Sequence, residues 1–156
     1  GPPRLAATIM VHHLYLTLDD VIGGSLRPHF FCKPIAKRRE DRKSLMQAAF
    51  SGRGRFFLGT DSAPHPVDAK ECDHGCAGVY SAPVAMPLLA SSFEAHSGEG
   101  WIEKLEAFVG EHGARFYSLP LNESTLELSR EKWRVPERFG EVVPFFAGEE
   151  LIWRVR

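Results

Sequence analysis

Two β-prone segments with one helix-forming segment between them most constrain the fold of this chain. Residues 5–11 form a short apolar run without alternation, which is typical of a strand buried on both faces of a parallel sheet. Residues 39–51 have the apolar spacing of a helix that Gly52 would end, and residues 55–60 form a second strand. The order predicts an α/β fold in which two parallel strands are joined by a right-handed helical crossover.

The rest of the chain adds a long loop, further helices and a different kind of strand. We expect a loop at 12–38, a second loop at 66–78, helices from 82 to about 95 and from 101 to about 112, with Gly113 as the stop of the latter, and half-exposed strands at 125–129 and 151–155. Long ordered loops tend to carry function, so the segment at 12–38 is of interest.

Composition and charge restrict the class of protein. The chain has 156 residues, of which 44% are hydrophobic and 25% charged, as expected for one folded unit. The net charge of -1, with both signs mixed, does not favour nucleic acid or a membrane surface as a partner. Without an apolar run of roughly 20 residues or a signal peptide, the expected location is cytoplasmic. The odd number of cysteines, Cys32, Cys72 and Cys76, argues against a disulfide framework.

A polar cluster follows the second expected strand. In α/β folds, catalytic groups lie at the C-terminal ends of the strands. Asp61, at such a strand end, could ligate a metal and exchange a proton with a bound water. The alternative for Asp61 is an Asx-turn or a helix cap. His65, four residues on and behind a proline, could hold a substrate carboxylate, or it could be a solvated loop histidine.

Two further groups of histidine and cysteine are weaker candidates. Cys72, His74 and Cys76 are all zinc-capable, but their spacing lacks the separated pairs of a tetrahedral structural site. The adjacent His12 and His13 point to opposite sides of an extended chain, so we expect one to be packed and the other exposed.

Taken together, collinear motifs along the whole chain resemble the class II, or bacterial-type, dihydroorotases of the amidohydrolase superfamily. The Gly-Thr-Asp-Ser-Ala-Pro-His and Gly-Cys-Ala-Gly segments are the most specific. The residues that carry the likeness are Leu5-Ala6-Ala7-Thr8-Ile9, His13-Leu14, Gly23-Gly24, Arg27-Pro28-His29-Phe30-Phe31-Cys32, Pro34-Ile35, Lys37-Arg38, Phe57-Leu58-Gly59-Thr60-Asp61-Ser62-Ala63-Pro64-His65, Lys70-Glu71, Gly75-Cys76-Ala77-Gly78, Phe116-Tyr117, Leu119-Pro120, Asn122, Val143-Pro144-Phe145 and Ala147-Gly148-Glu149.

The resemblance implies a fold and a set of site residues. Residues 1–156 would be the C-terminal part of a (β/α)8 TIM barrel, namely strands 7 and 8 with their helices, plus a C-terminal extension. The activity implied is zinc-dependent hydrolysis of the cyclic amide L-dihydroorotate to N-carbamoyl-L-aspartate in pyrimidine biosynthesis. Asp61 would be a ligand of one of two zinc ions and the proton carrier, while His65 and the backbone of Ala77 would hold the substrate carboxylate. The backbone of Lys33 would contact the ring, although a lysine replaces the apolar residue expected there.

Most metal ligands of that family are expected upstream of Leu5, so the chain alone would be inactive. The expected partners are a small-molecule substrate and either a second copy of the chain, since the family forms dimers, or a missing N-terminal segment. Three readings stay open: part of an active enzyme, an inactive fragment that self-associates, and a binding module. Another cyclic-amide hydrolase, such as an allantoinase or hydantoinase, is the nearest alternative activity.

Overall fold

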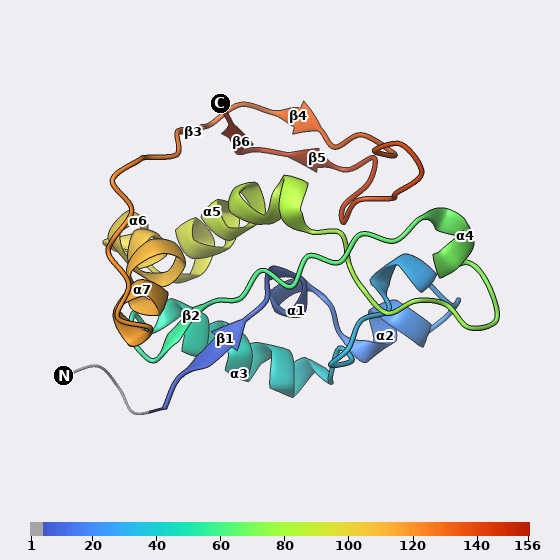
Figure 1. Ribbon diagram of the computed structural model, residues 1–156, viewed down its shortest axis with the longest axis horizontal. Coiled ribbons are helices and arrows are strands. Elements are labelled where there is room, and N and C mark those ends of the chain that lie inside the picture. Colours follow the sequence, from blue (N-terminus) through green and yellow to red (C-terminus); the bar gives the residue numbers. More distant parts are fainter. Residues whose placement is uncertain (1–4) are drawn as a thin grey trace.

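The computed structural model describes residues 5–156 and contains the predicted parallel strand pair. Strands β1 (Ala7–Ile9) and β2 (Phe56–Leu58) lie side by side (Figure 1), with Ala7 opposite Phe56 and Ile9 opposite Leu58. The crossover between them contains α3 (Arg39–Phe50), which matches the helix expected at 39–51. The prediction of an α/β fold with a β-α-β unit is therefore confirmed.

Helices make up most of the remaining structure. In chain order they are α1 (Val11–Tyr15), α2 (Leu18–Ile22), the 3-10 turn η1 (Pro28–Phe30), α3, α4 (Val67–Lys70), the 3-10 turn η2 (Ala82–Val84), α5 (Ala85–His96), α6 (Trp101–Glu106), the π-helical turn η3 (Ala107–Glu111) and α7 (His112–Phe116). No helix within residues 5–156 has the length and apolar character needed to cross a membrane.

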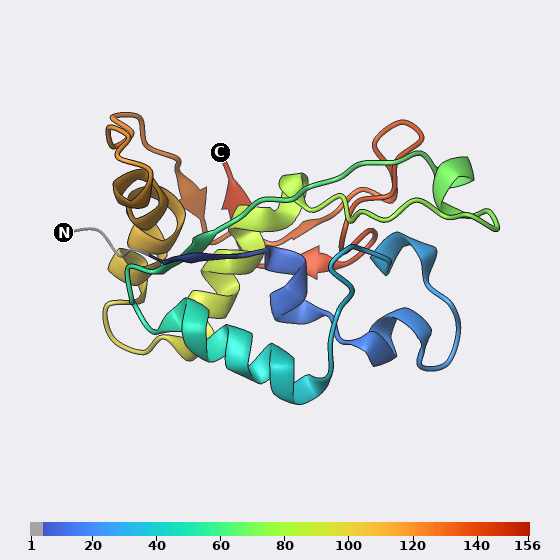
Figure 2. The same ribbon diagram turned by 60° about the horizontal axis from the view of Figure 1, so that its bottom comes forward.

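The C-terminal tail forms two short antiparallel pairs, β3 (Leu128–Ser129) with β6 (Arg154–Val155) and β4 (Trp133–Arg134) with β5 (Glu150–Leu151). They lie along α5, on the side away from α3 (Figures 1 and 2). The indole N–H of Trp133 donates to the carbonyl of Trp153 at 2.6 Å, and the Trp153 ring meets that of Trp101 with centroids 5.8 Å apart. The tail is thus anchored on α6. The two expected tail strands are confirmed in part: 125–129 ends in β3, and 151–155 is divided between β5 and β6, which pair with different partners.

Four sequence expectations need correction. The segment at 66–78, expected to be a loop, contains the short helix α4. The segment at 12–38 contains α1, α2 and η1; α2 begins where Thr17 donates to the Asp20 carboxylate from both its N–H and its hydroxyl, each at 2.7 Å. Strand β1 has three residues because α1 begins at Val11. Ala7 and Thr8 are exposed because, among residues 5–156, the sheet consists of β1 and β2. Gly113 does not end the helix: a Cβ there would lie 3.1 Å from the Phe57 ring, so this glycine lets α7 approach β2.

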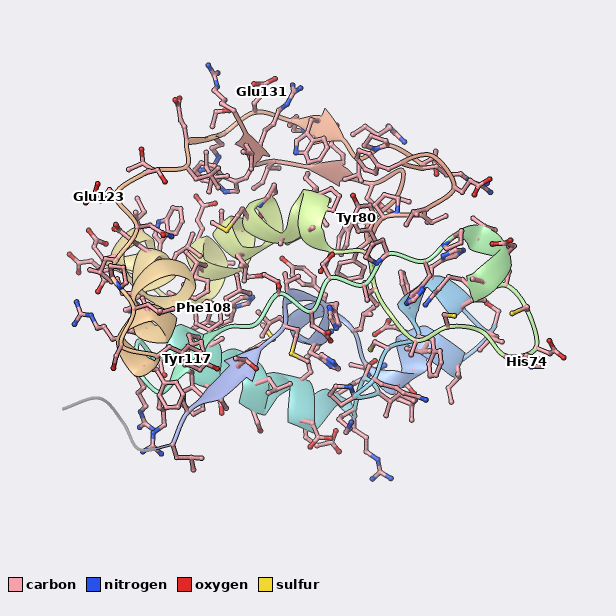
Figure 3. The ribbon with its side chains drawn as sticks, in the orientation of Figure 1. His74, Tyr80, Phe108, Tyr117, Glu123 and Glu131 are labelled. Atoms are coloured by element: carbon pink, nitrogen blue, oxygen red, sulfur yellow. The ribbon has the colours of Figure 1, made fainter. Side chains whose placement is uncertain are left out.

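The core is centred on α5. Phe93 is fully buried, and its ring lies 4.8 Å from that of Phe50 on α3 and 5.4 Å from that of Phe108 in η3. Figure 3 shows Phe108 between the helices on this side of the molecule. Because α3, α5 and η3 share this aromatic cluster, the helices hold the strand pair from which the polar loops emerge.

Candidate functional site

Asp61 lies just beyond the end of β2, in an unusual backbone conformation. Its φ of +39° belongs to the left-handed region, where aspartate and asparagine are enriched and which is over-represented at functional sites. Two residues before it, Gly59 packs against β1 so closely that a Cβ would lie 2.7 Å from the Cβ of Thr8. The strand end is therefore fixed, and the exposed Asp61 side chain is displayed beyond it.

His65 lies beside the loop that contains Ala77. Ser62 forms a parallel bridge with Val79, and the N–H of Ala63 donates to the carbonyl of Val79 at 3.1 Å. These two segments run next to one another from the centre of the molecule toward α4 (Figure 1). Gly78 lets its segment pack closely against the other, since a Cβ there would lie 2.6 Å from that of Ala63 and 2.9 Å from the His65 ring. The fold thus brings His65 to the Ala77 segment.

Lys70, at the end of α4, is buried beneath these loops, and only 3% of it is exposed. Its ammonium group donates to three backbone carbonyls: Phe31 at 3.0 Å, Cys76 at 2.8 Å and Gly78 at 2.6 Å. Burial lowers the pKa of Lys70 from its ordinary value. Sequence reasoning missed this residue because a lysine beside Glu71 carries no local sign of burial.

The loop that contains Lys33 is tied to the same network. The N–H of Gly78 donates to the carbonyl of Phe31 at 2.8 Å, two residues before Lys33. Lys33 itself is exposed and precedes a cis peptide bond to Pro34. The structure therefore brings the Lys33 and Ala77 loops together.

His12, His13 and Cys32 form a buried cluster behind Asp61. The two histidines are 0% and 7% exposed, so the expectation that one would be exposed is wrong; both lie on α1 rather than on an extended chain. Burial, with a smaller contribution from His13, lowers the pKa of His12 to about 4. Burial also lowers the pKa of His13, as does Lys37, and the nearby Asp61 carboxylate opposes this effect.

The cluster has the chemistry of a candidate metal site, because one ligand atom from each of its three residues lies within 4.8 Å of the others. Cys32 Sγ donates to the Pro34 carbonyl at 3.4 Å and lies 3.9 Å from His13 Nε2. Burial raises the pKa of Cys32, whereas a metal binds the thiolate. Asp61 is not one of the three residues that converge here.

For the predicted zinc site itself, residues 5–156 supply one assigned ligand. A carboxylate is a suitable oxygen ligand for zinc, and the exposed position of Asp61 leaves its oxygens accessible. Zinc takes about four ligands, so Asp61 could contribute to such a site only if other residues supplied the remaining ligands.

Cys72, His74 and Cys76 lie on the loop after α4. His74 is 86% exposed and projects from the far end of the molecule (Figure 3), and Cys72 is also exposed. In the described chain they are not among the side chains that converge as metal ligands.

Comparison with known proteins gives a consistent picture. The chain is 47% identical over 155 residues to a dihydroorotase of Sphingopyxis alaskensis, matching 99% of this chain and 45% of the relative. It is 49% identical over 159 residues to a dihydroorotase of Alkalilimnicola ehrlichii, matching 99% of this chain and 46% of the relative. No protein-family model matches the chain.

Solved structures agree. A dihydroorotase from Campylobacter jejuni is 47% identical, with a TM-score of 0.84 over 97% of this chain and 45% of its own. A dihydroorotase from Saccharomyces cerevisiae, solved in complex with 5-fluoroorotic acid, is 40% identical, with a TM-score of 0.85 over 99% of this chain and 43% of its own. The chain therefore spans less than half the length of the relatives it matches, as predicted for a portion of such an enzyme, and its fold is that of the matching portion.

Proposed function

Because this chain is homologous to the dihydroorotases along nearly its whole length, we propose that it is the C-terminal part of a zinc-dependent dihydroorotase. That enzyme would interconvert L-dihydroorotate and N-carbamoyl-L-aspartate in de novo pyrimidine biosynthesis, and residues 1–156 would form one portion of its barrel. The observation that carries the proposal is the arrangement at the end of β2, where Asp61 stands beyond the strand and His65 lies against the Ala77 segment. Activity requires the remaining barrel strands, because this portion supplies one assigned zinc ligand.

In this proposal Asp61 would help to hold zinc and also carry the proton. The two zinc ions of such an enzyme, when bound, lower the pKa of the attacking water and polarise the ring carbonyl. The Asp61 carboxylate accepts a proton from that water and donates it to the nitrogen of the breaking amide bond. The same proton moves in the opposite direction when the ring closes.

The substrate would be oriented by His65 and by backbone groups. The His65 ring and the Ala77 N–H would bind its carboxylate, and the backbone of Lys33 would contact its ring. Two features support these assignments. The absence of a side chain at Gly78 allows the segment to lie close to His65. Within residues 5–156 the N–H of Ala77 makes no backbone hydrogen bond, while those of Cys76 and Gly78 do. The 5-fluoroorotic acid in the yeast structure is a ring carboxylic acid of the kind these groups would bind.

The experiment is an assay of the full-length gene product with added zinc, following dihydroorotate by ultraviolet absorbance. We expect Asp61→Asn to reduce kcat by at least 100-fold, because the isosteric substitution removes the carboxylate that would carry the proton. Asp68→Asn, at an exposed carboxylate on α4, is the matched control and should retain full activity. Full activity in Asp61→Asn would refute the assigned role.

Other readings make different predictions in the same assay. An allantoinase or hydantoinase would turn over allantoin or hydantoin in preference to dihydroorotate. A binding module would bind dihydroorotate without turning it over. An inactive fragment would show no turnover in any form of the gene product. The same proposal includes assembly of the chain with a second copy or with an upstream segment, and it includes a cytoplasmic location. Sedimentation of the full-length product would determine its assembly state.

A further inference from the structure

Lys70 is a buried cation that pairs with no carboxylate in the part of the chain that the structure describes. Within residues 5–156 it forms no ion pair, although lysine is almost never buried unless it is paired. Its three N–H donors are all used, one on each of three backbone carbonyls at 2.6 to 3.0 Å. The position of the Lys70 ammonium group is therefore fixed by these three hydrogen bonds. Any effect of Lys70 on the site acts through the backbone segments that it joins.

The carbonyls it holds include those on both sides of Ala77. Lys70 Nζ lies 2.8 Å from the carbonyl of Cys76 and 2.6 Å from that of Gly78. The N–H groups of the same two residues are also engaged, Cys76 with Ala69 and Gly78 with Phe31, each at 2.8 Å. Ala77 therefore sits between two anchored peptides, and its own N–H is left without a backbone partner in the described chain.

The third carbonyl connects this segment to the other loop. Phe31 accepts from both Gly78 N–H and Lys70 Nζ, the latter at 3.0 Å. Lys33 follows Phe31 by two residues, so a single ammonium group links the backbone near Lys33 to the backbone around Ala77.

We propose that Lys70 is a positioning residue for substrate binding, which fixes the Ala77 N–H and the Lys33 backbone at the spacing that a ring carboxylate requires. This inference rests on the function proposed above. Lys70 does not touch the substrate, because all three of its donors point to carbonyls. Its positive charge next to the Ala77 peptide additionally favours an anion at that site.

The test compares Lys70→Met, Lys70→Gln and Lys70→Arg in the full-length gene product. Met keeps the approximate length and removes every donor, Gln keeps two donors without charge, and Arg keeps charge and donors. We expect Lys70→Met to raise KM for dihydroorotate at least 10-fold with kcat changed by less than 3-fold, because the backbone contacts would hold substrate and transition state alike. Gln and Arg should give intermediate KM values.

The control is Lys104→Met. Lys104 on α6 also donates to two backbone carbonyls, Ser97 at 2.6 Å and Glu99 at 3.3 Å, but at the opposite end of the molecule from α4 (Figure 1). Its loss should leave KM unchanged. Equal KM effects at both lysines, or a fall in kcat without a change in KM at Lys70, would show that Lys70 has only a structural role.

A second readout does not depend on catalysis. Amide hydrogen exchange of Gly78, whose N–H is bound to the Phe31 carbonyl, should become at least 10-fold faster in Lys70→Met and stay unchanged in Lys104→Met. Unchanged exchange at Gly78 overturns the inference. If the unmodified protein lacks dihydroorotase activity while Gly78 exchange still responds, the proposed function fails and the loop anchoring by Lys70 stands.

Discussion

His12 should make the chain sensitive to mild acid, and replacing it should remove part of that sensitivity. The ring is fully buried and neither nitrogen has a hydrogen-bond partner in the described chain. Burial lowers its pKa from 6.5 to about 4, so the folded state resists protonation of this ring. We therefore expect His12→Leu to lose stability less steeply than the parent chain as the pH falls.

The direction and size follow from proton linkage. Between pH 6.5 and about 4 the unfolded chain protonates His12 while the folded chain does not, so the unfolded state binds more protons and stability falls as the pH falls. The free energy of unfolding changes by at most about 1.4 kcal/mol for each pH unit in this interval. Protonation of His12 therefore lowers the free energy of unfolding by at most about 3 kcal/mol, and this loss is complete below pH 4. The lowered pKa of His13 adds a further loss of the same sign, which the variant keeps.

The assay is urea unfolding followed by tryptophan fluorescence at pH 7, 6, 5 and 4.5. At pH 7 His12→Leu should be as stable as the parent or more stable by about 1 kcal/mol, because it removes two buried polar atoms that lack partners. The difference should grow as the pH decreases. His74→Leu, at an exposed ring, serves as the control. Parallel stability curves for the parent and His12→Leu across this range would refute the reasoning.

Two further predictions test the packing that supports the site. Phe93→Ala should reduce the free energy of unfolding by about 3–5 kcal/mol, because it empties the position between the rings of Phe50 and Phe108; urea unfolding checks this, and a loss below 1 kcal/mol would contradict it. Gly59→Ala should destabilise the chain by about 1–3 kcal/mol, because the added Cβ would clash with Thr8. In a double-mutant cycle, Thr8→Gly should relieve the clash, and additive effects of the two substitutions on the free energy of unfolding would contradict this prediction.

The sequence was most informative where short-range pattern decides the structure. The parallel strand pair and α3 follow from apolar spacing and chain order, and the motif around Asp61 placed it correctly at a strand end. The sequence was least informative at 12–38, where helices of five residues or fewer have too few turns for a periodic apolar pattern to appear. The expectation that one of His12 and His13 is exposed was wrong for the same reason, because it assumed an extended chain where α1 forms.

Lys70 shows a different limit. Its burial is set by three carbonyls, one of which lies 39 positions away in the chain, and backbone carbonyls are the same for every residue type. No composition or spacing rule can therefore distinguish Lys70 from a solvated lysine at the end of a short helix. The same holds for Ala77 and Lys33, whose proposed roles use the main chain, so only resemblance indicated them.

On the function proposed above, the two parts of the enzyme would contribute unequally to catalysis. This chain would provide one zinc ligand, the proton carrier and the groups that bind the substrate carboxylate and ring, while the other metal ligands would come from upstream. Substitutions at His65, Lys70 or the Ala77 segment should then change KM and leave metal content unaltered. A substitution at Asp61 should change kcat and metal content together, since one side chain would serve both purposes. Metal analysis alongside kinetics therefore separates the two roles, and a His65 variant that loses zinc would show that the sites are not independent.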